Sequence, residues 1–146
     1  MNAMLSRQGQ RLLQVGMVFI LYSAVEGFAI PLFRSPRIGL SVHTLGAVQA
    51  VLLLALGLVW PRLTLGDISS RIAFWCLVYS AVAILAAYTL AAMWGVGNET
   101  IVLMGELPHG LHRGSVVQEN AIKVVAYSSA PTGLTAFALI LWGLRR

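Results

Sequence analysis

The residue with the clearest potential for chemistry is His43, an imidazole inside a long apolar segment. Small residues surround it at the three- and four-residue spacing of one helix face: Gly39, Gly46, Ala47 and Ala50. A flat group can approach such a face closely, and a neutral imidazole is a common axial ligand of haem iron. The pattern therefore suggests a haem platform. A helix-packing seam that carries an interhelical hydrogen bond is the alternative.

Three further polar side chains fall at the depth of His43 when the apolar segments thread back and forth: Glu26, Tyr88 and Lys123. Ionisable groups inside a membrane are costly and usually face a partner or a cavity. We therefore expect a polar pocket assembled from all four segments. A structural ion pair between Glu26 and Lys123 or an arginine is the alternative to a catalytic acid.

A second polar level lies about 9 Å deeper along the helices, at 1.5 Å per residue. Gln49 falls there, near the expected level of Ser128 and Ser129. Cations near the level of His43 could form ion pairs with the two propionates of a haem. They are Arg34, Arg37, Arg113 and Lys123.

His109 and His112 lack carboxylates at a convincing spacing, which favours solvated loop side chains over a metal site.

Composition indicates that lipid, not water, surrounds these residues. Apolar side chains make up 58% of the 146 residues and charged ones 10%, against about 45–50% and 25% in soluble domains. The mean hydropathy is +0.82. The net charge of +5 is scattered singly at segment ends, which argues against a nucleic-acid partner. The single cysteine, Cys76, rules out an internal disulfide.

The apolar residues form stretches of the length that a membrane helix needs, about 20 residues. Proline, arginine and glycine separate the first three by short turns, and only 97–118 is a long connection. We see no repeat, so residues 1–146 are expected to form a single all-α domain, a bundle of four transmembrane helices. The predicted ranges are 12–33, 38–60, 72–96 and 119–144.

Arginine and lysine favour the cytoplasmic side of a membrane. More of them fall on the side of the two termini than on the other, so we expect both termini in the cytoplasm and the protein in a bacterial inner membrane. The tryptophans support the segment limits, because they fall near the predicted helix ends, where such rings anchor at the interface. They are Trp60, Trp75, Trp94 and Trp142.

The chain resembles the small membrane isomerases that include hydroxylaminobenzene mutase and styrene oxide isomerase. The likeness rests on PRIGLSVHTLGAVQ at 36–49, VWP at 59–61, RIAFWCLVY at 71–79 and TLAAM at 89–93. Ser128-Ser129 and LWGL at 141–144 extend it into the last segment. In this order and with short first and second loops, the pieces look closer to the mutase branch.

The resemblance implies a homotrimer with haem b at the subunit interfaces, and ferric iron acting as a Lewis acid. Carried over by position, His43 is the iron ligand and Tyr88 a substrate-site tyrosine, and Arg37 is expected to bind the cofactor. Gln49 stands where the epoxide isomerases have asparagine. That departure fits another small aromatic substrate, and we expect an arylhydroxylamine to be converted to 2-aminophenol, with Gln49 and Tyr88 as catalytic residues.

Three other functions stay open at this point. The first is an epoxide isomerase of the styrene oxide type. The second is a non-catalytic haem-binding anchor subunit, which usually has two histidine ligands, whereas only one histidine lies within a predicted helix. The third is a small four-helix transporter, in which Glu26 would couple transport to an ion.

Overall fold

The computed structural model describes residues 3–97, 100–101 and 114–145, and within these ranges it contains helices and no strand. All four long helices of these ranges are apolar enough to cross a membrane, which confirms the predicted all-α architecture. Two short 3₁₀ turns follow the first two helices, η1 (Ile30–Leu32) and η2 (Trp60–Arg62). The helices are α1 (Ala3–Ala29), α2 (Pro36–Val59), α3 (Asp67–Trp94) and α4 (Val116–Gly143).

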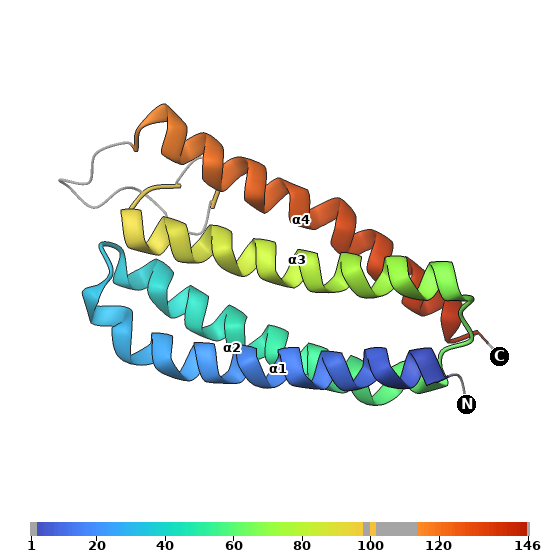
Figure 1. The fold of residues 1–146 in the computed structure, drawn as a ribbon. Helices are drawn as coiled ribbons and strands as arrows, with labels where there is room; N and C mark the ends of the chain where they lie inside the picture. The colour runs from blue at the N-terminus through green and yellow to red at the C-terminus, as the bar shows by residue number, and fades with distance from the viewer. Residues whose placement is uncertain (1–2, 98–99, 102–113, 146) are drawn as a thin grey trace.

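The helices form two antiparallel hairpins that lie side by side (Figure 1). α1 packs along α2, α3 packs along α4, and contacts between α2 and α3 join the two hairpins. Among the described residues α4 makes no comparable contact with α1 or α2. Both termini lie at the same end of the molecule, as expected for an even number of spans (Figure 1). Within the described ranges α4 therefore packs mainly against α3.

The first helix begins earlier than the predicted range 12–33, because its polar first turns are tied to the other helices. Gln8 is buried, and its Oε1 accepts hydrogen bonds from Trp60 Nε1 at 3.1 Å and from Ser70 Oγ. A buried amide that makes such bonds does not oppose helix formation. α1 ends at Ala29, since Pro31 has no backbone N–H to continue the helix, and η1 follows.

The last helix also begins before its predicted range, 119–144, because a capping box starts it. The Gln118 N–H donates to Ser115 Oγ at 3.2 Å, and the Ser115 N–H donates to Gln118 Oε1 at 3.0 Å. These bonds satisfy backbone donors that the first turn of a helix leaves open. α3 ends at Trp94 because Gly95 takes the left-handed conformation, with φ 68°.

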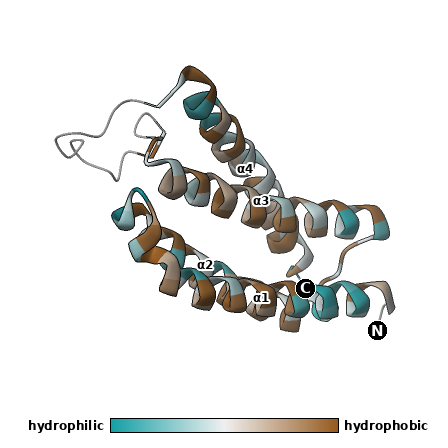
Figure 2. Cartoon of the chain, turned by 60° about the vertical axis from the view of Figure 1, so that its left-hand side comes forward, coloured by the Kyte–Doolittle hydropathy of each residue, from teal (hydrophilic) through white to brown (hydrophobic). Residues whose placement is uncertain are grey.

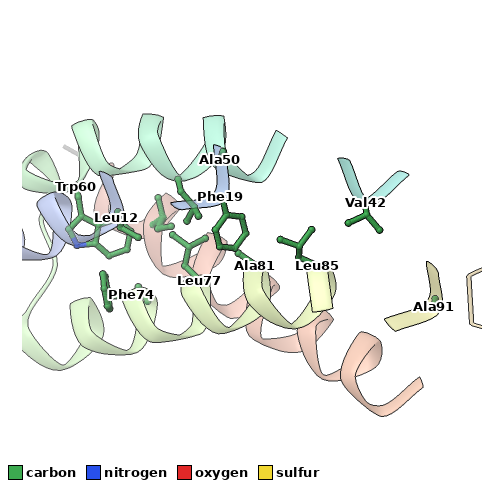
Figure 3. Packing of buried hydrophobic residues seen from close by; sticks show 14 of the residues in the cluster. Leu12, Phe19, Val42, Ala50, Trp60, Phe74, Leu77, Ala81, Leu85 and Ala91 are labelled. Atoms are coloured by element: carbon green, nitrogen blue, oxygen red, sulfur yellow. The ribbon is translucent and has the colours of Figure 1, made fainter. Parts of the chain in front are cut away.

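The hydrophobic core contains buried side chains from all four helices, and Figure 3 labels members of it from α1, α2 and α3. Glycines let α1 and α2 approach closely, since a Cβ at Gly9 would meet the carbonyl oxygen of Gly57 at 2.7 Å. Apolar residues cover the middle of each helix and hydrophilic ones gather near the helix ends (Figure 2). This division is the one that a bilayer imposes, with the apolar surface facing lipid and the polar ends facing headgroups and water.

Candidate functional site

The imidazole of His43 is held against α1 by a backbone acceptor. Its Nδ1 lies 2.8 Å from the carbonyl oxygen of Ser23. A carbonyl can only accept a hydrogen bond, so Nδ1 carries the proton in this contact. The neutral ring then has its lone pair on Nε2. Since 40% of the His43 side chain is exposed, that nitrogen belongs to a ring that a ligand can reach from outside the chain.

Gly27 makes room for the imidazole. A Cβ at Gly27 would lie 2.9 Å from His43 Nδ1 and 3.0 Å from Cε1, which real side chains do not tolerate. The hydroxyl of Ser23, itself buried, donates to the carbonyl oxygen of His43 at 2.8 Å. Sequence reasoning missed Ser23 and Gly27. The available signal was their spacing from Glu26, because positions 23, 26 and 27 share one face of a helix.

Glu26 is the ionisable neighbour of His43. Its carboxylate Oε2 lies 3.8 Å from His43 Nδ1, and only 4% of the side chain is exposed. Neither carboxylate oxygen has a hydrogen-bond partner among the described residues. The predicted closeness of Glu26 and His43 is thus confirmed. An ion pair between Glu26 and Lys123 is not found, because Lys123 is exposed on α4, which packs against α3.

Tyr88 lies in a different place, a groove of about 470 Å³ between α2 and α3. The α2 residues from Leu40 to Val48 that line it include Ser41 and Thr44, and Ile84 joins Tyr88 on the α3 side. The two α2 hydroxyls donate to carbonyl oxygens of their own helix, so the groove is mainly apolar. The Tyr88 hydroxyl has no hydrogen-bond partner in the part of the chain that the structure describes, and it is free to bond a ligand.

Gln49 and Arg37 stand apart from this groove. Gln49 is partly buried on α2 and forms no hydrogen bond with a described residue. Arg37 is exposed in the first turn of α2, and its guanidinium has no ion-pair partner within the described ranges. The groove includes neither His43 nor Gln49. A single chain therefore does not bring the three predicted site residues His43, Gln49 and Tyr88 into this groove.

The predicted pocket built from all four helices is wrong. At the deeper level, Ser128 Oγ pairs with the Tyr79 hydroxyl at 2.8 Å, and Ser80 Oγ donates to the carbonyl oxygen of Ser129 at 2.8 Å. These bonds join α4 to α3 and leave Gln49 without the expected neighbours. The physical reason is that the polar groups of α4 are satisfied across one interface, so nothing draws α4 toward α1 and α2.

Two of the small residues of α2, Gly39 and Gly46, pack closely against neighbouring side chains. A Cβ at Gly39 would lie 2.6 Å from Phe33 Cδ2, and one at Gly46 would lie 3.3 Å from Ser23 Cβ. These glycines, both buried, serve the packing seam that the sequence left as the alternative, while Ala47 is exposed. The predicted loop residues His109, His112 and Arg113 lie outside the described residues.

Comparison with known proteins supports an enzyme. The family model described as styrene oxide isomerase matches residues 8–145. Hydroxylaminobenzene mutase HabB of Ectopseudomonas oleovorans is 40% identical over 136 residues, which cover 93% of this chain and 80% of that protein. Hydroxylaminobenzene mutase HabA of the same organism is 31% identical over 131 residues, covering 90% of this chain and 94% of that protein. No solved structure matches the chain.

The family match includes both halves of the site, the α1 segment that holds the imidazole and the α2 segment that carries it. It extends through α4 as well, so the resemblance seen in the sequence is confirmed over nearly the whole chain. Four apolar helices of spanning length agree with an enzyme embedded in a membrane. The chain belongs to the styrene oxide isomerase family and is a membrane isomerase.

Proposed function

We propose that this isomerase converts an arylhydroxylamine such as hydroxylaminobenzene into 2-aminophenol, using a ferric haem b that His43 holds. The observation that carries the proposal is the 2.8 Å bond from His43 Nδ1 to the Ser23 carbonyl, which engages Nδ1 and leaves Nε2 as the ring nitrogen available to a ligand on a partly exposed side chain. The proposed substrate is inferred from the names of the two relatives, which are both hydroxylaminobenzene mutases.

The residues present fit a haem. A histidine whose far nitrogen donates to a backbone carbonyl is the usual form of a metal-bound imidazole. The described residues contain no group of three or more His, Cys, Asp or Glu that could hold a bare ion, so iron at His43 would take its other ligands from a macrocycle. The guanidinium of Arg37, which has no ion-pair partner among the described residues, would form an ion pair with a propionate. When bound, ferric haem b would supply a Lewis acid that weakens the N–O bond.

The proposed reaction rearranges the substrate without net oxidation or reduction. The N–O bond breaks, a C–O bond forms at the ortho carbon, one proton leaves that carbon and one reaches nitrogen. The Tyr88 hydroxyl would orient the substrate and carry a proton, because it has no other partner among the described residues. The Gln49 amide would bind the substrate oxygen. The apolar groove wall around Tyr88 would keep water from competing for the ring.

We propose a homotrimer in which neighbouring copies complete each site. The imidazole of His43 is open at the chain surface, and the groove beside Tyr88 does not include it, so one chain alone separates two groups that the reaction needs together. Co-assembly of His43→Ala and Tyr88→Phe chains tests this arrangement. Mixed trimers should regain part of the activity that each inactive variant lacks. No regain from mixed trimers of confirmed composition would contradict sites shared between copies.

The proposed location is a bacterial inner membrane, with both termini in the cytoplasm. Both termini lie at one end of the molecule, and this end carries Arg7, Arg11, Arg62, Arg71 and Arg145. Cations prefer the cytoplasmic side of a membrane. Reporter fusions at each terminus should be active only with a cytoplasmic reporter, and a periplasmic signal from either terminus would reverse the orientation.

An epoxide isomerase is the second candidate, because the matching family model is described as styrene oxide isomerase. Turnover of hydroxylaminobenzene and of styrene oxide by the same preparation separates the two. We expect a higher kcat/KM for hydroxylaminobenzene. The opposite ranking would select the epoxide reaction and leave the isomerase class intact.

The main experiment is an absorption spectrum and a turnover assay of detergent-purified protein. Wild-type protein should show a haem Soret band and should convert hydroxylaminobenzene without added reductant. His43→Ala should lose both, since it removes the proposed iron ligand. Colourless, iron-free wild-type protein with full activity would overturn the haem mechanism. Full haem retention by His43→Ala would overturn the assignment of His43 as the iron ligand.

A further inference from the structure

A second candidate site lies at the end of the molecule where both termini are found. Three arginines line one pocket of about 310 Å³ there, Arg7 and Arg11 from α1 and Arg71 from α3. Gln8, Phe74, Trp75 and Met4 complete its wall. Figure 2 shows hydrophilic turns gathered at this end, at the beginning of α1 and of α3. The pocket takes no part in the proposed isomerase chemistry, because His43 lies toward the other end of α2.

The three guanidinium groups have no counter-charge among the residues that the structure describes. None of them forms an ion pair or a hydrogen bond with a side chain of the described residues, although each is exposed enough to do so. Asp67, the described carboxylate at this end of α3, is exposed and pairs with none of them. Three like charges facing one pocket repel one another, so binding an anion there would be favourable.

The floor of the pocket is fixed before any ligand arrives. Gln8 is held by its bonds with Trp60 and Ser70. The Phe74 ring packs edge-on against Trp60, with centroids 6.2 Å apart, and against Trp75 at 5.3 Å. Trp75 remains 63% exposed beside the pocket. The arginines therefore surround a rigid aromatic and amide base, and binding would need to order only the arginine side chains.

We propose that this pocket binds the phosphate headgroup of an anionic phospholipid. Guanidinium groups pair with phosphate oxygens in a bidentate manner, and three of them face one cavity. The position favours a lipid over a soluble phosphate, because the pocket lies where two spans begin and next to an exposed tryptophan, the residue that anchors at headgroup level. An exposed Ile72 beside Arg71 would contact the upper part of an acyl chain.

Binding of phosphatidylglycerol to detergent-purified full-length protein, measured by native mass spectrometry or with a fluorescent lipid, tests the proposal. Arg7→Gln/Arg71→Gln should weaken binding about tenfold or more, since it removes two of the three cations that line the pocket. The matched control is Arg62→Gln/Arg145→Gln, which removes the same charge at the same end but outside the pocket. It should change binding less than twofold, a margin set by weak surface pairs.

Three results would overturn the proposal. Equal weakening by both double variants would show a general surface-charge effect. Equal binding of phosphatidylcholine and phosphatidylglycerol would show that the headgroup charge is not recognised. Competition by millimolar inorganic phosphate would show a free-anion site instead of a lipid site. Arg7→Lys/Arg71→Lys keeps the charges without the bidentate fork, and it should bind with intermediate strength in a protein that elutes like the wild type.

Discussion

His43 and Ser23 each bond the other's backbone carbonyl with a side chain, across the interface of α1 and α2. His43 Nδ1 donates to the Ser23 carbonyl at 2.8 Å, and Ser23 Oγ donates to the His43 carbonyl at 2.8 Å. A carbonyl oxygen has two lone pairs, so the Ser23 carbonyl can serve the helix and the imidazole together. The proton on Nδ1 is thus positioned by a backbone group that no side-chain substitution at position 23 removes.

Gly27→Ala should displace the imidazole. The added methyl group would fall 2.9 Å from His43 Nδ1, and the backbone of α1 cannot retreat without breaking its packing on α2. We expect haem content per chain to fall about tenfold, the effect of losing a group that orients a metal ligand. Gly66→Ala is the control, because nothing lies within 4 Å of its added Cβ. Full haem in Gly27→Ala would contradict the tight fit.

Ser23→Ala should act differently from Gly27→Ala, because it leaves the carbonyl acceptor in place. It removes the hydroxyl bond to the His43 carbonyl and the longer contact of the hydroxyl with His43 Nδ1 at 3.3 Å, but not the 2.8 Å bond from Nδ1 to the Ser23 carbonyl. The free energy of unfolding should therefore fall by about 1 kcal/mol while haem is retained. Unfolding in mixed detergent and the Soret absorbance measure the two effects. Loss of haem from a folded Ser23→Ala protein would show that the hydroxyl, not the carbonyl, orients the ring.

Glu26→Gln keeps the shape of a buried side chain and removes its capacity for negative charge. A carboxylate 3.8 Å from Nδ1 would make the imidazole a stronger electron donor, which would stabilise the ferric state of the proposed haem. We therefore expect the haem midpoint potential to rise in the variant. Glu119→Gln is the control, since Glu119 accepts from the Gly97 N–H at 3.0 Å, on the α3/α4 side of the molecule. Equal potentials in wild type and Glu26→Gln would remove the proposed influence.

Tyr88→Phe should retain haem and lose turnover. The substitution removes the hydroxyl that we assign to substrate orientation and proton transfer, a role that contributes on the order of a hundredfold or more. Tyr79→Phe is a matched control on the same helix, because its hydroxyl pairs with Ser128 at 2.8 Å between α3 and α4. If both variants keep wild-type rates, the hydroxyl of Tyr88 has no part in the reaction.

The sequence was sufficient to predict the spans and the neighbourhood of Glu26 and His43. Apolar stretches of spanning length define the helices, and antiparallel threading places Glu26 and His43 at one depth. The sequence also contained the capping box of α4, in Ser115 and Gln118, which the predicted range overlooked. Such helix starts are local features that a closer inspection of residue types can find.

The remaining features depend on which helix surfaces meet. Nothing in residue spacing shows that, among the described helices, α4 packs mainly on α3, because small and polar residues occur on several faces of the spans. The acceptor of His43 was also beyond prediction, since it is a backbone carbonyl and every residue has one. The position of Gly27 becomes meaningful only when the imidazole is known to lie over it.

Among the described residues, the hydrogen-bond acceptor, the carboxylate and the glycine that lie against the imidazole come from the first hairpin. Ser23, Glu26, Gly27 and His43 lie on α1 and α2, and α2 ends at Val59. During synthesis this hairpin emerges from the ribosome before α3 and α4, and its two helices have their main packing partner in each other. The orientation of the imidazole can therefore be established co-translationally, as soon as the first two helices enter the membrane together.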